Sequence, residues 1–236
     1  MTDGDEAATI DAARSPRFLL RGQLLQWGAA VVLVAVAWAL AAPAFGAGSW
    51  LGVTDVAWFW ANVAVCVLHQ AYVWFAFRTQ LGWGTFTRWF GRRDLAVHGA
   101  LFLPMLVARP VVVLGAGLAN RGTLALPPVV AVALGLVLLL PAAYTGWSVA
   151  RYFGLARALG GDHFRARYRE GPLVDSGAFG WTPNAMYTFG FLGLWSIGLL
   201  CQSQVALVAA LFQHAFVWAH YLGTEQPDMA LLYDAR

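Results

Sequence analysis

The stretch PVVAVALGLVLLLPAAYTGWSVA, residues 128–150, decides the fold class of this 236-residue chain. It carries no charged residue over its whole length. About 20 consecutive, mostly apolar residues suffice for a helix to cross the hydrocarbon core of a bilayer. We therefore expect residues 128–150 to form a transmembrane helix.

Five other segments share this apolar character. The six expected spans are residues 24–45, 56–77, 97–118, 128–150, 186–201 and 205–222. The last two are short and are joined by Gln202-Ser203-Gln204, which predicts a tight helical hairpin. The expected fold class is all-α: a polytopic transmembrane helical bundle of about six spans with a C-terminal helical hairpin.

The overall composition agrees with a membrane protein. The chain is 60% hydrophobic and 11% charged, whereas soluble domains carry about 25% charged residues. All 15 basic residues are arginines that mostly flank apolar spans. This placement indicates membrane topology and contact with the lipid bilayer, and it does not favour a nucleic-acid partner. The sequence carries no signal for an oligomeric state.

Arginine placement also orients the chain. Thirteen of the 15 arginines fall in the termini or in the loops on one side of the six-span topology. The opposite loops contain only Arg121, and Arg109 lies inside the third span. Because cytoplasmic loops are enriched in basic residues, we expect cytoplasmic termini and a multi-pass protein of a bacterial inner membrane.

Three regions follow from these patterns. Residues 1–18 are polar and are expected to be a disordered tail, because they cannot bury enough apolar surface. Residues 19–143 hold the first spans. Residues 144–236 hold the segments with possible chemistry, and they are expected to form a catalytic region.

The polar segment after the fourth span contains the first candidate residues. Arg151 and Arg157 can meet a carboxylate or phosphate with two hydrogen bonds, or they can simply be interfacial charges. Asp162 and His163 are adjacent in a glycine-marked loop. A histidine titrates near neutral pH, so this pair is a candidate for proton transfer, although both can also be ordinary loop residues.

A second motif precedes the fifth span. Leu173-Val174, Ser176-Gly177, Met186-Tyr187 and Gly190 occur in an order that resembles the integral-membrane phospholipid N-methyltransferase and isoprenylcysteine carboxyl methyltransferase superfamily. That resemblance implies S-adenosylmethionine as cofactor. The Pro183-Asn184-Ala185 sequence departs from the family pattern, in which proline stands nearer to Met-Tyr. Asn184 is also a good N-cap for the span that follows.

The third motif follows the last span. Glu225 matches the first residue of an acidic pair in that superfamily, and Gln226 replaces the second. The Glu225-Gln226-Pro227-Asp228-Met229 form resembles the phosphatidylethanolamine branch. Alternatively, this segment is a capped surface helix whose acidic side chains are solvated.

The resemblance and the patterns together assign these roles. The catalytic candidates are Glu225, His163 and Asp162. The cofactor-binding candidates are Arg151, Gly154, Asn184, Met186, Tyr187, Gly190, Glu225 and Gln226. The substrate-binding candidates are Arg157, His214 and Tyr233. No metal site is expected, because His214 and His220 are poorly spaced for zinc on one helix.

The favoured function is S-adenosylmethionine-dependent methyl transfer to a lipid headgroup amine of the phosphatidylethanolamine type, at the cytoplasmic face. The chain would then be an integral-membrane methyltransferase with a membrane lipid as substrate. The alternatives are methylation of a prenylated thiol, a carboxyl or another small lipophilic acceptor, an NADPH enzyme of the sterol-reductase type, or a non-enzymatic transporter.

Overall fold

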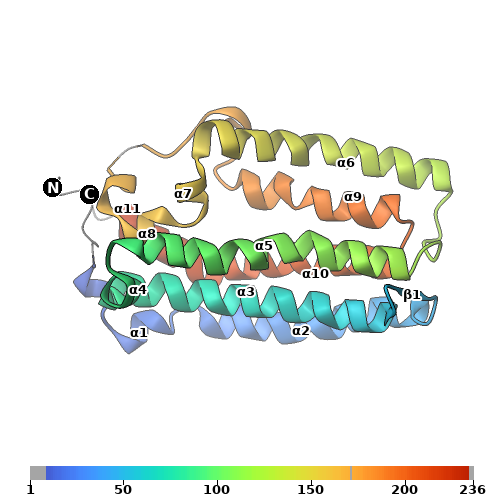
Figure 1. Ribbon diagram of the computed structural model, residues 1–236, viewed down its shortest axis with the longest axis horizontal. Helices are drawn as coiled ribbons and strands as arrows, with labels where there is room; N and C mark the ends of the chain where they lie inside the picture. Colours follow the sequence, from blue (N-terminus) through green and yellow to red (C-terminus); the bar gives the residue numbers. More distant parts are fainter. Residues whose placement is uncertain (1–8, 171, 234–236) are drawn as a thin grey trace.

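The computed structural model describes residues 9–170 and 172–233, and it shows a bundle of long helices that lie side by side (Figure 1). The expectation of an all-α, polytopic bundle is confirmed. The long helices and one shorter partner are α2 (Gln23–Ala41), α3 (Asp55–Trp83), α5 (Asp94–Ala119), α6 (Pro128–Ser148), α9 (Leu192–Leu200) and α10 (Gln204–His220).

Shorter elements occupy the two ends of the bundle. The short α-helices are α1 (Pro16–Leu19), α4 (Thr85–Phe90), α7 (Leu155–Ala158), α8 (Gly161–Phe164) and α11 (Gln226–Tyr233). Single 3-10 turns cover Asp11–Ala13, Ala42–Ala44, Gly91–Arg93, Ala166–Tyr168 and Gly177–Gly180. A two-residue hairpin of β1 (Ser49–Trp50) and β2 (Val53–Thr54) lies at the end opposite to α4 and α8 (Figure 1).

Five stretches of the described chain are long and apolar enough to cross a membrane. They are Pro16–Ala44, Asp55–Trp83, Thr85–Ala119, Pro128–Phe153 and Gln204–Tyr233. The remaining expected span corresponds to the shorter apolar helix Met186–Leu200. The last helical stretch continues well past the expected end at residue 222, because α11 follows α10 through a stretch of π-helix.

The expected C-terminal hairpin is present. Helix α9 packs against α10, and the turn between them holds Gln202 at a φ of +53°. The Ser203 hydroxyl accepts a hydrogen bond from the Ala206 N–H at 3.1 Å and so caps α10. Capping of this kind satisfies one of the free N–H groups at a helix start, which is why three polar residues suffice for the reversal.

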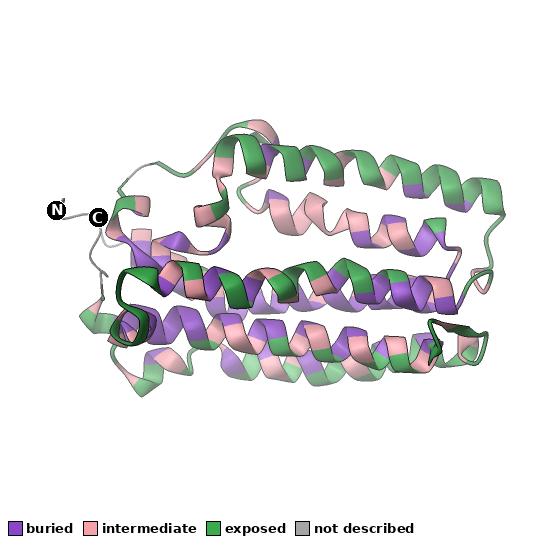
Figure 2. Cartoon of the chain, in the orientation of Figure 1, coloured by how far each residue is buried: buried purple, intermediate pink, exposed green. Residues whose placement is uncertain are grey.

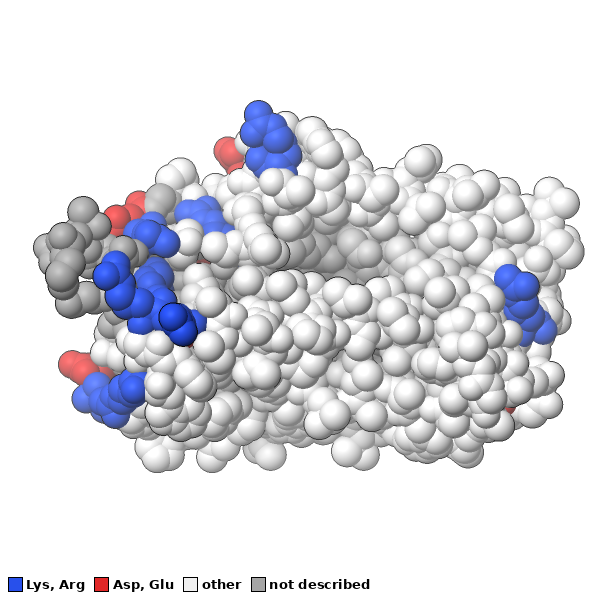
Figure 3. Space-filling model, in the orientation of Figure 1, with Lys and Arg blue, Asp and Glu red and all other residues white. Residues whose placement is uncertain are grey.

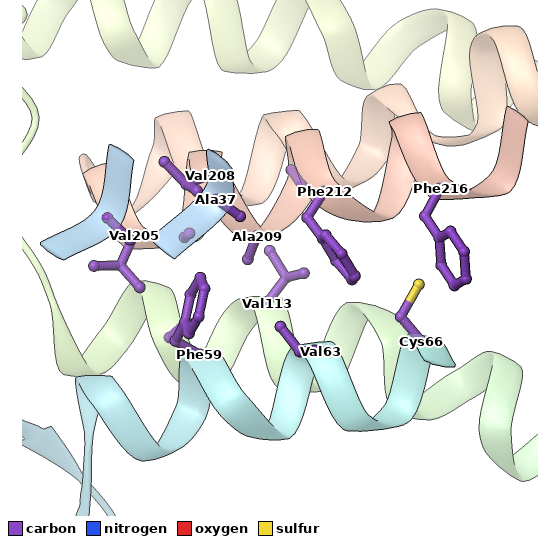
Figure 4. Close-up of a cluster of buried hydrophobic side chains, with 14 of the residues drawn as sticks. Ala37, Phe59, Val63, Cys66, Val113, Val205, Val208, Ala209, Phe212 and Phe216 are labelled. Atoms are coloured by element: carbon purple, nitrogen blue, oxygen red, sulfur yellow. The ribbon is translucent and has the colours of Figure 1, made fainter. Parts of the chain in front are cut away.

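Helix α10 forms the centre of the bundle. It packs against α2, α3, α5 and α9, and its buried Phe212 and Phe216 meet Phe59 and Cys66 of α3 in the main apolar cluster (Figure 4). Lipid tails are as apolar as these side chains, so close packing rather than water exclusion holds such helices together. A central α10 therefore fixes the position of whatever its C-terminal end carries.

Helix α6 lies at the periphery and is exposed along most of its length (Figure 2). Its main partner is α9. The Ser196 hydroxyl donates to the Gly135 carbonyl at 2.8 Å, and a Cβ on Gly135 would lie 2.9 Å from Leu200 Cγ. Small residues permit this close approach of two membrane helices.

The end with the β-hairpin is joined by one polar cluster. The Asp55 carboxylate accepts from the N–H groups of Gly46 and Ala47 and from the Asn120 amide at 2.8 Å. The side-chain Oδ1 of Asn120 accepts from the Ser203 hydroxyl at 3.1 Å. The α2–α3 loop, the end of α5 and the α9–α10 turn therefore meet at these residues.

The other end of the bundle carries most of the visible basic side chains (Figure 3). Part of the region that we expected to be a disordered tail belongs to the fold at this end. Ala13 and Phe18 are buried against Leu81 and Leu232, and the Ile10 N–H donates to the Leu81 carbonyl at 2.9 Å. The prediction of a disordered tail is wrong for residues 9–18, because their apolar side chains pack against distant helices. Residues 1–8 lie outside the described residues.

Candidate functional site

Three short stretches of π-helix interrupt the described helices, and all three coincide with the motifs singled out in the sequence. They are Val149–Phe153, Met186–Gly190 and Tyr221–Glu225. A π-helical turn contains one extra residue per turn and re-aims the side chains that follow it, and such turns are frequent at functional sites. No pattern in the sequence predicts these turns.

The second and third motifs meet through one side-chain pair. The Tyr187 hydroxyl lies 2.6 Å from both carboxylate oxygens of Glu225. Tyr187 comes from the π-helical turn before α9, and Glu225 ends the π-helical turn after α10. The Glu225 side chain keeps 20% of its accessible surface, so its carboxylate is oriented by a hydrogen bond and is still reachable.

A buried amide network lies behind Glu225. Nε2 of His220 is 3.4 Å from the carboxylate, and Nδ1 of the same ring is 3.1 Å from Oε1 of Gln26. Gln26 also accepts from the Thr224 hydroxyl at 2.7 Å, and Gln23 donates to that hydroxyl at 3.0 Å. Helix α2 therefore supplies two glutamines that fix the segment ahead of Glu225.

Arg78 of α3 ties this segment to the N-terminal part of the chain. Its fully buried guanidinium donates to Asp228 Oδ1 at 3.0 Å. It also donates to the carbonyls of Gly223 at 3.0 Å and Thr224 at 3.2 Å. The remaining donors meet main-chain carbonyls at the start of α2: those of Phe18, Leu19 and Arg21.

Two glycines make this arrangement possible. Gly22 has a φ of +77°, and a Cβ there would lie 2.2 Å from the Gly223 carbonyl oxygen. A side chain at that position would have both a strained backbone and a clash with the main chain. The close approach brings the start of α2 against the π-helical turn that carries Glu225.

Asp162 and His163 lie in α8 and not in an open loop. Nδ1 of His163 is 3.1 Å from Asp162, and Nε2 is 3.5 Å from Asp228. The ring stacks on Phe77 with centroids 3.9 Å apart. Burial disfavours the charged imidazole, but the two carboxylates outweigh it and raise the pKa of His163 to about 9. Burial likewise opposes ionisation of Asp162, yet the neighbouring His163 lowers the pKa of that carboxyl.

Two of the expected substrate-binding residues surround the same cluster. The Tyr233 hydroxyl donates to Asp162 Oδ2 at 3.2 Å. Arg157 donates to the carbonyl of Tyr168 at 3.1 Å and lies 3.4 Å from that of Pro172. These contacts hold the segment between α8 and the second motif, and they join Tyr233 to the acid that we had considered for proton transfer.

His214, the third expected substrate-binding residue, lies deeper in the bundle. Its Nδ1 accepts from the Trp195 indole at 3.1 Å, and its ring stacks with Phe191 at 5.4 Å. The ring also interacts with the Tyr187 main chain. His214 thus supports the π-helical turn that carries Tyr187.

The remaining expected cofactor residues lie around these motifs. Arg151 is exposed and lies over the Tyr152 ring at 5.4 Å, and Gly154 has a φ of +84° with open space beside it. Met186 packs against the buried Ala178 cluster. Gly190 is the last residue of the second π-helical turn, and Gln226 directly follows the third.

The expected cap at Asn184 takes a different form. Its main-chain carbonyl accepts from the N–H groups of Tyr187 at 3.0 Å and Thr188 at 2.9 Å. The side-chain cap that we expected belongs to an ordinary α-helix start, whereas this helix begins with a π-helical turn.

The residues that position Glu225 are not predicted from the sequence. Arg78 is one of the 13 arginines assigned to termini or loops, but it lies inside α3. Gln26 and Asp228 carry no predicted role, and His220 is considered only as a metal ligand. Their partners are 150 to 198 residues away in sequence, so no local pattern joins them. The available signal was a set of polar residues inside apolar spans, which is unusual in membrane helices. Among the described residues, no group of three or more His, Cys, Asp or Glu side chains could hold a metal ion.

Comparison with known proteins matches the phospholipid methyltransferase family to residues 130–236. A 75-residue segment is 31% identical to phosphatidylethanolamine N-methyltransferases of Scheffersomyces stipitis and Candida albicans. The identity to the enzyme of Candida tropicalis is 29%. Each match covers 31% of this chain and 8% of the relative's length. No solved structure matches the chain significantly.

Proposed function

We propose a lipid methyltransferase function on the premise that residues 130–236 of this multi-pass membrane chain belong to the phospholipid methyltransferase family. The proposed reaction is transfer of a methyl group from S-adenosylmethionine to the amine of a lipid headgroup. The relatives are named phosphatidylethanolamine N-methyltransferases, so an ethanolamine-type headgroup is the proposed acceptor.

The hydrogen bond between Tyr187 and Glu225 carries this proposal. It joins two motifs 38 residues apart through a contact of 2.6 Å and leaves the carboxylate partly accessible. A fixed carboxylate can accept hydrogen bonds from a lipid amine and take up its proton, which leaves the nitrogen lone pair free. Holding the amine in one orientation is a large part of what a transfer reaction needs.

The surrounding residues fit a cofactor that is an amino acid joined to a nucleoside. Bound S-adenosylmethionine would supply an activated methyl group on a sulfonium. Glu225 can accept from its ammonium group, and the exposed Arg151 can meet its carboxylate. Tyr144 and Trp181 stack at 5.1 Å beside this region and offer aromatic faces, while Gly146 and Gly154 border open space.

Asp162 and His163 are proposed to hold Glu225 in place rather than to contact the substrate. Both lie in the cluster of Asp228 and Arg78, and Arg78 holds the carbonyls of Gly223 and Thr224 next to Glu225. A charged His163 between two carboxylates strengthens that cluster. The pair would then set the geometry of Glu225.

We also propose that the arginine-rich end faces the cytoplasm, since basic residues are enriched on that side. The polar cofactor would enter there. The lipid would enter sideways, along the furrow between α6 and α5 that Figure 3 shows. Helix α6 packs mainly on α9 and α5 packs on α3 and α9, so α9 with its Tyr187 turn lies behind this opening.

The test is calorimetric binding of S-adenosylmethionine and S-adenosylhomocysteine to the detergent-purified protein, with mass spectrometry of a phosphatidylethanolamine substrate. Glu225→Gln should lower methyl transfer at least 100-fold, in line with the loss of a positioned acid–base group. Its unfolding transition should stay close to that of the unaltered protein, because the side chain is partly exposed. The fully exposed Asp11→Asn is the matched carboxylate control.

Either of two results would remove the proposal. One is the absence of binding of both ligands to a folded, monodisperse sample. The other is turnover by Glu225→Gln at the rate of the unaltered protein.

A further inference from the structure

Arg109 is a buried cation in the interior of the bundle. It lies on α5, 15 residues from the helix start, and is 4% exposed. Its Nε donates to Gln213 at 2.8 Å, and one NH2 hydrogen points to Cys66 Sγ at 3.1 Å. Its guanidinium also lies over the Phe191 ring at 4.9 Å.

Most of its hydrogen-bonding capacity is unused. A guanidinium has five N–H donors, and only two of these have a side-chain acceptor among the described residues. No carboxylate of the described chain lies within 4.0 Å of it, the distance within which the other buried arginines form ion pairs. A charge at this depth is costly and is retained where it serves a function.

Other polar groups near it also lack partners. Asn62, Cys66 and His69 follow one another at helical spacing on α3, so they share the face that meets α5 and α10. The Asn62 side-chain oxygen accepts from Gln213 at 2.6 Å. Asn62 Nδ2 and the two ring nitrogens of His69 have no hydrogen-bond partner within residues 9–170 and 172–233. Buried polar atoms without partners usually mark a water or a ligand.

The position of Arg109 relative to Glu225 matches the order of groups in a lipid. Phe191 lies one turn deeper than Tyr187 on the same helix, and their rings are 6.2 Å apart. Because side chains tilt toward the start of their helix, the Arg109 guanidinium points back toward the arginine-rich end where Glu225 lies. In a leaflet, the amine of a phosphatidylethanolamine lies outermost and its phosphate lies one step deeper.

We propose that Arg109, supported by Gln213 and Asn62, binds the phosphate of the lipid acceptor while Glu225 holds the amine. This inference rests on the proposed function. It adds a binding residue that lies outside residues 130–236, the part matched by the family. The phosphate would take the free N–H donors in a two-bond arrangement, which a guanidinium suits better than an ammonium. The acyl chains would leave between α5 and α6.

The experiment compares two acceptors in phosphate-free detergent micelles: dioleoylphosphatidylethanolamine and hexadecylamine, which has an amine but no phosphate. Arg109→Gln should lower kcat/KM for the phospholipid about 10- to 100-fold, the range for one charged hydrogen bond. The same variant should change methylation of hexadecylamine by less than about twofold, because that acceptor makes no phosphate contact. The kcat/KM of Arg109→Lys for the phospholipid should lie between those of the unaltered protein and Arg109→Gln. Lysine keeps the positive charge but cannot make the two parallel hydrogen bonds of a guanidinium. Arg121→Gln, at the other end of the bundle, is the matched control.

Equal losses on both acceptors, or no loss on either, would overturn the phosphate site. Loss of S-adenosylhomocysteine binding in Arg109→Gln would also overturn it, because the arginine would then hold the cofactor.

A failure of the proposed function can be separated from a failure of this site. If the unaltered protein methylates neither acceptor, native mass spectrometry still compares its binding of dioleoylphosphatidylethanolamine and of dioleoylglycerol. Preference for the phospholipid that is lost in Arg109→Gln supports the phosphate site. The absence of any preference refutes it.

Discussion

Arg78 and Arg109 are two buried arginines in neighbouring helices, and they differ in how far their donors are used. Arg78 donates to one carboxylate and five main-chain carbonyls. Arg109 donates to one amide oxygen and one sulfur. A saturated arginine fixes the surrounding chain, whereas an arginine with free donors is prepared for a ligand.

The same contrast extends to their surroundings. The cluster around Arg78 contains Asp228, Asp162 and His163, so its charges compensate one another. Around Arg109 no carboxylate lies nearby among the described residues, and Asn62 Nδ2 and both His69 nitrogens have no hydrogen-bond partner there. Around Arg78, His163 Nε2 and Asp228 Oδ2 also lack a hydrogen bond, but they lie 3.5 Å from each other as an ion pair. The first arrangement favours a single folded geometry, and the second sacrifices stability at a place where binding can recover it.

The largest expected effect comes from replacing each arginine by methionine. Arg78→Met leaves two buried carboxylates, Asp162 and Asp228, with His163 as their shared cation, and it removes the donor to five main-chain carbonyls. It should lower the free energy of unfolding by about 3–5 kcal/mol. Arg109→Met removes an unpaired charge and should leave stability unchanged or raised. Unfolding titrations in mixed detergent micelles measure both values. Similar losses for the two variants would break the comparison.

A smaller effect should come from pH, through His163. Its folded pKa of about 9 lies above the ordinary 6.5, so the protonated ring stabilises the fold fully below about pH 6.5. That contribution is lost as the pH rises through 9, and it amounts to about 3 kcal/mol. The pKa of Asp162 is lowered, so its ionised carboxylate stabilises the fold at neutral pH. That stabilisation is lost only as the pH falls into the acid range.

The control for this dependence is His163→Gln, which should flatten the decline of stability between pH 7 and pH 10. A decline of the same size in that variant would assign the effect to another group. Arg109→Gln should keep the decline, because within the described chain Arg109 makes no hydrogen bond or ion pair with His163 or with the carboxylates of Asp162 and Asp228.

The smallest effect is expected at His69. Its ring is 2% exposed and lies edge-on to Phe102 at 4.7 Å, with both nitrogens unpartnered. His69→Leu should therefore change the free energy of unfolding by less than about 1 kcal/mol. A loss above 2 kcal/mol in the same titration would show that the ring has a strong partner, and the cluster around Arg109 would then be less open than we infer.

The helices and the motifs could be predicted from the sequence because their signals are local. An apolar run such as residues 128–150 specifies a membrane helix by its own length, and Gln202 to Gln204 interrupt the apolar pattern where the hairpin turns. The Tyr187 and Glu225 motifs were recognised by order and resemblance. Their direct contact is a result of the fold, since it depends on how α9 and α10 end.

The positioning residues could not be predicted for a physical reason. Arg78, Gln26 and Gly22 act through partners near the other end of the sequence, and single-sequence patterns do not encode such pairs. The burial of residues 9–18 has the same origin. Ala13 and Phe18 are two apolar residues in a mostly polar segment, and their packing partners lie far away in sequence. The three π-helical turns likewise depend on tertiary packing rather than on propensity.

The bonds from Arg78 and Gln26 to the Glu225 segment, together with the contact of Gly22 with Gly223, bear on how this protein can be divided. An excised fragment of residues 130–236 would lack α2, α3 and α5, and with them Gln23, Gln26 and Arg78, which bind the segment before Glu225. Expressed alone, it should be inert; supplied with residues 1–129 as a second polypeptide, it should regain its shape by assembly in the bilayer. The region that the family model matches, residues 130–236, is therefore smaller than the region that must fold together.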